Sequence, residues 1–122
     1  MAQLNWSAGE LAEGLKCYRA EQFFDAHEHW ESVWLGLEDP EKKFLQGLIQ
    51  VTVAFHHFTK KNYRGTQSLL EAALTRLKSI PAPSFAGIDH ICLCSDIEEW
   101  LRAFKTEEMI FPQRYPRIVY LE

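Results

Sequence analysis

Apolar residues recur every three to four positions along most of the chain, which is the spacing of an amphipathic α-helix. Stretches of this kind are expected to form helices over about residues 8–20, 23–36, 40–60, 63–80 and 87–104. No segment of length alternates between apolar and polar residues as a half-buried strand does. Short connections between helices favour antiparallel packing of neighbours. The pattern therefore predicts an all-α fold, in which residues 1–122 form a single-domain bundle of about five helices.

Residues with strong capping preferences mark the expected helix starts. Ser7 followed by Glu10 has the form of a capping box, in which each side chain bonds a free amide of the first turn. Asp39 is expected to cap the third helix, with Pro40 as its first residue. Asn62 is expected to cap the fourth helix in the same way.

Prolines interrupt the helical pattern in two places. Residues 81–84, Pro-Ala-Pro-Ser, are expected to end the fourth helix. Pro112 and Pro116 predict an extended C-terminal tail from about residue 111 to residue 121. The tail carries apolar residues that suit packing against the bundle or a neighbouring subunit, namely Phe111, Tyr115, Ile118, Val119 and Tyr120.

Composition and charge narrow the class of protein. A length of 122 residues with 47% hydrophobic residues suits one globular core. The formal net charge of -4 argues against a nucleic-acid partner, because phosphate binding needs a clustered basic face. The longest apolar run, residues 47–58, is too short to cross a membrane, and the N-terminus lacks the features of a secretion signal. We therefore expect a cytoplasmic protein without a membrane partner. Because most soluble oligomers are symmetric homo-oligomers, we also expect a homo-oligomer, most simply a homodimer.

Candidate chemistry lies on the expected second helix. At about 100° per residue, His27, Glu28 and Glu31 fall on one edge of that helix, beside an apolar stripe. One imidazole and two carboxylates in this arrangement can bind a cation, transfer a proton or form salt bridges. The pattern indicates where a site would be and leaves its chemistry open.

Uncharged polar side chains mark one face of the expected third helix. Gln46, Gln50 and His57 lie among apolar residues, which suits a half-buried cleft, whereas the alternative is an ordinary solvent face. If the second and third helices form an antiparallel hairpin, a rise of about 1.5 Å per residue brings Gln50 roughly level with His27. Gln50 is then the expected partner of His27, and the reach of His57 depends on helix tilt.

Three kinds of chemistry suit these residues. His27, Glu31 and His57 are candidate ligands of a divalent metal ion such as Zn, Mn, Fe or Ni, although the second histidine of the zinc-protease motif is lacking. Without a metal, His27 would act as an acid or base that Glu31 orients, with Glu28 as a further catalytic candidate. The third interpretation is a structural polar network, because His27 and Glu31 also form an ordinary i, i+4 helix pair.

Three motifs in order carry a resemblance to a known family. They are Phe24-x-Ala-His-Glu-x-x-Glu-x-x-Trp34, Phe44-Leu-Gln-Gly-Leu-Ile-Gln50, and His57 followed by Asn62-x-Arg-Gly65. Over about residues 23–77 the chain resembles domain-of-unknown-function family 309. The resemblance implies a compact all-helical bundle and no established activity. It also implies that the motif residues match the family's pattern, namely His27, Glu28, Glu31, Trp34, Gln46, Gly47, Gln50, His57, Asn62 and Gly65.

Two functional hypotheses follow, and they leave open whether the protein is an enzyme. The first is a polar ligand- or metal-binding cleft between the second and third helices, in a hydrolase-like enzyme. Its catalytic candidates are His27, Glu28 and Glu31, and its ligand-binding candidates are Trp34, Gln46, Gln50 and His57. The second is a non-catalytic protein-interaction module that binds a partner through a helical surface or the aromatic tail. On that hypothesis the polar network is structural, and the bundle should stay folded without residues 111–122.

Overall fold

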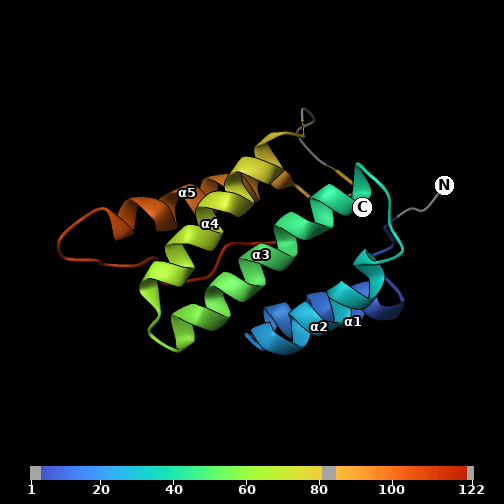
Figure 1. Ribbon diagram of the computed structural model, residues 1–122, viewed down its shortest axis with the longest axis horizontal. Helices are drawn as coiled ribbons and strands as arrows, with labels where there is room; N and C mark the ends of the chain where they lie inside the picture. The colour runs from blue at the N-terminus through green and yellow to red at the C-terminus, as the bar shows by residue number, and fades with distance from the viewer. Residues whose placement is uncertain (1–3, 81–84, 121–122) are drawn as a thin grey trace.

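The computed structural model describes residues 4–80 and 85–120. The helices that it contains are α1 (Gly9–Arg19), α2 (Phe23–Trp34), α3 (Glu41–Thr59), α4 (Tyr63–Lys78) and α5 (His90–Phe104) (Figure 1). The described residues include no strand, and only isolated bridges join Phe85, Ile88 and Tyr120. The predicted all-α fold is confirmed, with each expected helix present. Residues 81–84, expected to end the fourth helix, lie outside the described residues.

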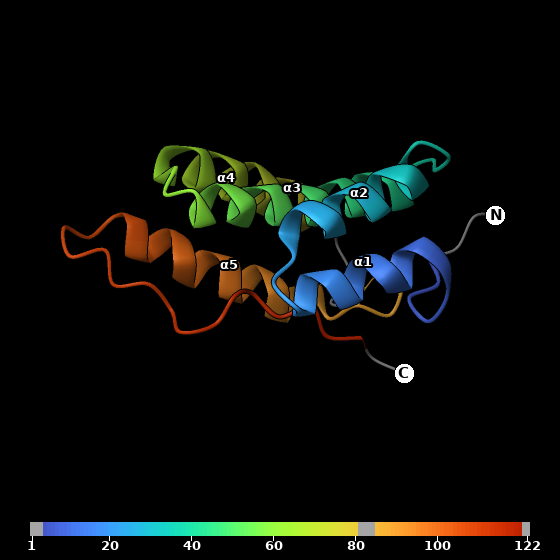
Figure 2. The same ribbon diagram turned by 90° about the horizontal axis from the view of Figure 1, so that it is seen from below.

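The helices form two layers. Figure 2 shows α2, α3 and α4 side by side in one layer, with α1, α5 and the C-terminal segment in the other. Successive helices pack against each other, and the chain changes layer between α1 and α2 and again between α4 and α5. The core lies between the layers, where α3 supplies the largest buried set. Fully buried large side chains include Trp30, Phe44, Leu48, Phe55, Leu77, Leu93 and Ile97.

The predicted capping box at Ser7 is wrong. The Ser7 hydroxyl donates to Asn5 Oδ1 over 2.6 Å, and the same oxygen accepts the Ser7 backbone N–H. This local turn occupies the hydroxyl that a cap would use, as Asn side chains commonly do near helix starts. Helix α1 begins at Gly9, with Ala8 in the cap position and no capping side chain.

The remaining predicted caps differ in outcome. Helix α3 begins at Glu41, so Pro40 takes the cap position, and the predicted cap by Asp39 is wrong by one residue. The predicted cap of α4 is confirmed, because Asn62 Oδ1 accepts the Gly65 N–H over 3.1 Å. Asp89 caps α5 in the same way, accepting the Cys92 N–H over 3.1 Å.

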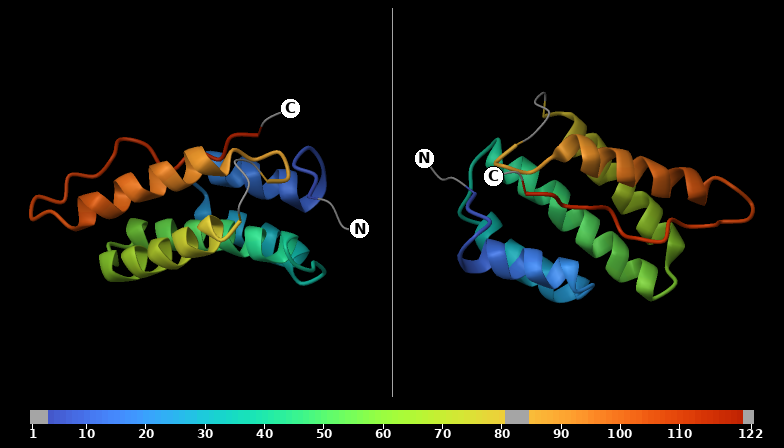
Figure 3. Two further views of the ribbon diagram at one scale, coloured as in Figure 1. Left: turned by 90° about the horizontal axis from the view of Figure 1, so that it is seen from above. Right: turned by 180° about the vertical axis from the view of Figure 1, so that it is seen from behind.

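The C-terminal segment packs onto the bundle. After α5 it returns across the back of α3 towards α1 (Figure 3). The Tyr18 hydroxyl donates to the Pro116 carbonyl over 2.6 Å, and Arg19 donates to the Ile118 carbonyl over 2.9 Å. Ile118 is itself buried. Because these residues complete the core, we expect the bundle to lose stability without residues 111–122, contrary to the sequence-based expectation.

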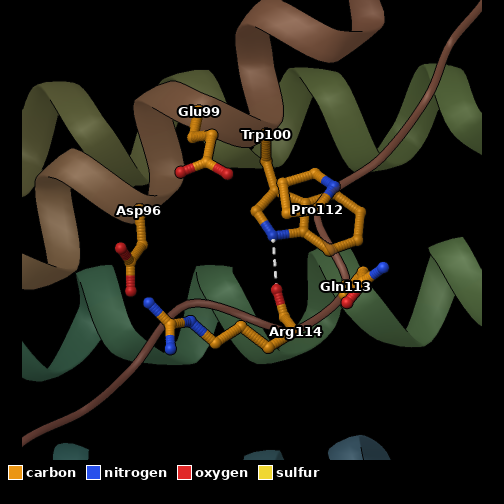
Figure 4. Close-up of a pocket in the computed structure, with 6 residues that line it drawn as sticks. All are labelled: Asp96, Glu99, Trp100, Pro112, Gln113 and Arg114. Atoms are coloured by element: carbon orange, nitrogen blue, oxygen red, sulfur yellow. Dashed lines mark hydrogen bonds between the residues drawn. The ribbon is translucent and has the colours of Figure 1, made fainter.

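Trp100 of α5 anchors the same segment. Its indole N–H donates to the Arg114 carbonyl over 3.1 Å, as Figure 4 shows, and its ring stacks on Tyr115 with centroids 5.6 Å apart. Phe23 of α2 and Phe55 of α3 meet the Tyr115 ring edge-on, each with centroids 4.9 Å apart. The tail thereby joins the two layers. No helix in the described residues is long and apolar enough to cross a membrane.

Candidate functional site

The inner face of α2 fixes which of its residues reach solvent. Phe23, Ala26 and Trp30 are buried, and the Trp30 indole donates to the Leu11 carbonyl of α1 over 3.1 Å. Because these buried apolar residues face the core, the residues about half a turn away must face outwards. The orientation of α2 thus follows from its own apolar spacing.

The outer face carries Phe24, Glu28, Glu31 and Leu35, which we call the α2 stripe. At about 100° per residue these four positions fall within roughly 60° of one another around the helix. Phe24 is 50% exposed and Leu35 is 74% exposed, and both glutamates are exposed. The stripe therefore presents an apolar side chain at each end and two carboxylates in the middle.

His27 and Glu31 form the pair that their spacing predicted. His27 Nε2 lies 2.7 Å from Glu31 Oε2, with 22% of the His27 side chain and 54% of the Glu31 side chain exposed. The other ring nitrogen of His27 is buried and has no hydrogen-bond partner among the described residues. The pair holds the Glu31 carboxylate at one side of the α2 stripe.

His56 is the α3 histidine that contacts Phe24 of α2, although the sequence favoured His57. The Phe24 ring lies between two histidines, with centroid distances of 5.6 Å to His27 and 5.5 Å to His56. Burial lowers the pKa of His56, and the neighbouring Lys60, His57 and His27 lower it further. His56 therefore favours its neutral form at this surface.

The polar face of α3 meets α4. Gln50 Oε1 accepts from Arg76 Nε over 3.3 Å, so the structure pairs Gln50 with α4 in place of His27. The His57 ring nitrogen Nδ1 lies 3.3 Å from the Asn62 side-chain nitrogen, at the α3–α4 connection. Gln46 is half-buried one turn before Gln50. The site residues of α2 and α3 thus divide between two flanks of the bundle.

Trp34 closes the connection between α2 and α3. Its indole N–H donates to the Lys42 carbonyl over 3.1 Å, and the Lys42 ammonium lies 4.5 Å from the ring centroid. This is a cation–π contact combined with a hydrogen bond to one residue. These contacts give Trp34 a structural role at the end of α2.

The donor set expected for a metal ion is not assembled. Within residues 4–80 and 85–120, no group of three or more His, Cys, Asp or Glu side chains is arranged to hold a metal. His27 and Glu31 are adjacent, whereas His57 lies against Asn62. A metal ion usually needs at least three protein ligands in one place. The residues present therefore do not fit such a group.

A second histidine of α2 links it to α1. His29 Nδ1 lies 2.7 Å from Glu10 Oε2. The hydrogen bond to Glu10 raises the pKa of His29, against the smaller opposing effect of burial, and the charges of Glu10, Glu13 and Asp25 raise it further. This exposed contact fastens the two helices together and depends on the protonation of His29.

The candidate site lies inside a segment of the chain that matches a known protein family. Residues 11–69 match the model of a family described as "Domain of unknown function (DUF309)". The segment runs from the first turn of α1 into α4, so it holds the α2 stripe and the polar face of α3. A comparison with curated proteins gives no match.

Proposed function

We propose that this chain, which belongs to the DUF309 family as its motifs predicted, is a non-catalytic protein-interaction module. Its α2 stripe binds a basic, apolar segment of a partner protein. One observation carries the proposal: Phe24 and Leu35 are exposed on the same stripe, with two glutamates between them.

The spacing of the stripe supports this function. Single exposed apolar residues are common on protein surfaces, but Phe24 and Leu35 are aligned along one helix. They are separated by about 16 Å at 1.5 Å per residue, which suits two anchors of an amphipathic partner helix. A row of exposed side chains along a helix suits a protein partner, because amphipathic partner helices bind through such spaced anchors, whereas small-molecule sites are concave.

Charge supports a basic partner. Helix α2 carries Asp25, Glu28 and Glu31 and has no lysine or arginine. Complementary charge speeds association and selects the partner more than it adds affinity. The contact with His27 holds the Glu31 carboxylate in place, so part of the recognition surface is preorganised.

A synthetic amphipathic helix of leucine and lysine residues is the probe that tests this function. We expect the double variant Phe24→Ser, Leu35→Ser to bind it about tenfold more weakly than the unaltered chain, the effect of losing central apolar anchors. Glu28→Gln should weaken binding and reduce its salt dependence. Ile91, 60% exposed on α5, and the exposed Glu99 supply matched controls, Ile91→Ser and Glu99→Gln.

Two results would overturn the proposal. Equal losses in the α2 variants and in the α5 controls would mean that the peptide binds without regard to the stripe. A dimer that the double variant abolishes, measured by analytical ultracentrifugation, would identify a second copy of the chain as the occupant. That second outcome would instead support the homodimer expected from the sequence.

A ligand-binding or hydrolase-like site is a second candidate, favoured by one observation. His27 and His56 flank the accessible Phe24 ring, and Glu31 lies 2.7 Å from His27, so two imidazoles and a carboxylate lie around one exposed aromatic side chain. Hydrolysis of p-nitrophenyl acetate is the probe. A general base contributes about 10²-fold or more, so His27→Gln should remove that activity while His29→Gln keeps it. Equal rates in both variants would reject the candidate.

A further inference from the structure

A pocket between α3 and α4 is lined by cationic and hydroxyl side chains. Its volume is about 410 Å³, and its lining residues are Lys43, Ala72, Thr75, Arg76 and Ser79. No acidic residue lines it. The pocket lies on the flank of α3 opposite α2, where Gln50 meets Arg76. Two positive charges facing one small cavity favour an anionic ligand.

The two cationic side chains of the pocket differ in how firmly they are held. Arg76 is half-buried, and its Nε is held by Gln50, which fixes the plane of the guanidinium. No other bond of this side chain is found within the described residues, so its terminal nitrogens are available to a ligand. Lys43 forms no ion pair in the same part of the chain. A preset fork and a flexible ammonium together suit the oxygens of one anion.

The hydroxyl groups add adaptable partners. Thr75 Oγ1 donates to the Glu71 carbonyl over 3.1 Å, and Ser79 Oγ donates to the Arg76 carbonyl over 2.6 Å. A hydroxyl proton can rotate between acceptors. An anion in the pocket would therefore compete for these donors without any movement of the backbone.

A pocket in the opposite layer shows a contrasting chemistry. It has a volume of about 500 Å³ and lies between α5 and the tail, where Figure 4 shows Asp96, Glu99 and Arg114 around the Trp100 ring. Asp96 is already engaged by Arg117, with 2.9 Å between Asp96 Oδ2 and Arg117 Nε. Opposite charges occur together there, so that pocket indicates no single class of ligand.

We infer that the α3–α4 pocket binds a small phosphate-bearing molecule, with Arg76 and Lys43 as the charged binding residues and Gln50 as a positioning residue for Arg76. A phosphate group matches both the double positive charge and the planar fork of arginine. The volume is within the range of small-molecule sites. This inference is independent of the proposed function of the α2 stripe, which lies on the other side of α3.

Titration with inorganic phosphate, followed by ¹H–¹⁵N NMR at constant ionic strength, tests the inference. We expect saturable shifts of the Arg76 Nε–H and of the Thr75 and Ser79 amides. Arg76→Gln should weaken binding about tenfold or more, and Lys43→Gln about threefold or more, since each removes one charge-assisted contact. The matched control is Arg102→Gln, which removes an exposed arginine of α5 and should leave affinity within about twofold.

The Arg76 Nε–H resonance tests separately whether Gln50 positions Arg76. Gln50→Ala should move the Arg76 Nε–H resonance before any phosphate is added, because that bond is lost, and should weaken phosphate binding about threefold. An unmoved Arg76 resonance would show that Gln50 does not position Arg76. The dispersion of each spectrum shows whether the variant is folded, and Lys43→Gln tests the pocket if the half-buried Arg76 cannot be replaced.

Three outcomes would overturn the inference. Shifts that increase linearly with phosphate and never saturate would indicate an adventitious ion only. Equal affinities for Arg76→Gln and Arg102→Gln would remove the pocket from the binding event. Acetate that binds at least as tightly as phosphate, at equal ionic strength, would exclude a phosphate-bearing ligand in favour of a carboxylate.

Discussion

The α2 stripe and the aromatic cluster around Trp100 use large apolar residues in opposite ways. The cluster gathers Trp100, Phe55, Phe58, Phe111 and Tyr115, whose ring centroids lie about 5 to 6 Å apart. The stripe leaves its aromatic and aliphatic residues half or more in solvent. Burial of aromatic area is a main source of folding free energy. The tail side of the molecule therefore supports the fold, whereas the α2 stripe is available to a partner.

Trp100→Ala should have the largest effect, on the folding side of this comparison. Trp100 is 3% exposed, stacks on Tyr115 and donates to the Arg114 carbonyl. The variant should lower the free energy of unfolding by about 3–5 kcal/mol, the usual cost of such a cavity. Denaturation by urea measures it. A loss below about 1 kcal/mol would mean that the cluster and the tail contribute little to stability.

Gly47→Ala should be next, because the Gly47 backbone of α3 lies close to the Leu77 side chain of α4. A Cβ at this position would lie 2.8 Å from Leu77 Cδ2, and Leu77 is fully buried. Overpacking of this kind costs about 1–3 kcal/mol. Gly36→Ala is the control, since its nearest neighbour would be 3.8 Å away. Equal unfolding free energies in both variants would contradict the close contact.

Asn62→Ala should cost about 1 kcal/mol, the usual value for a lost N-cap. Its side-chain oxygen accepts the Gly65 N–H, while its nitrogen lies 3.3 Å from His57. Asn62→Asp keeps the capping oxygen and should retain most of the stability. Thermal unfolding of the pair separates the cap from the His57 contact. An aspartate variant as unstable as the alanine variant would assign the effect to His57.

The charge link between α1 and α2 should give a smaller, pH-dependent effect. The hydrogen bond with Glu10 raises the pKa of His29 above its unfolded value of about 6.5, so the folded state binds this proton more tightly. The stabilisation is therefore complete below about pH 6.5 and is lost as the pH rises through the folded pKa.

The measurement is the difference in free energy of unfolding between the unaltered chain and His29→Gln at about pH 6 and about pH 9. It should be below about 1 kcal/mol at the lower pH, because exposed ion pairs are weak, and should shrink towards zero at the higher pH. A difference that grows with pH would reverse the sign and contradict the assignment.

The sequence predicted the parts of the molecule that depend on one helix at a time. Apolar spacing gave the helices, and the i, i+4 spacing of His27 and Glu31 gave their contact. Contacts between helices depend on how far each helix is rotated about its axis, which the sequence does not reveal. For this reason the predicted roles of His57 and Gln50 towards α2 did not appear in the structure. Instead, His56 approaches α2 and Gln50 meets Arg76.

The smallest expected effect on stability comes from the α2 stripe. We propose that the fold does not use this stripe, which is therefore free for a partner. The free energy of unfolding of Phe24→Ser, Leu35→Ser, measured by urea denaturation, should fall by less than about 1 kcal/mol, because Phe24 is 50% exposed and Leu35 is 74% exposed. A loss of about 3 kcal/mol or more, comparable to Trp100→Ala, would show that the stripe is a folding element and contradict the account.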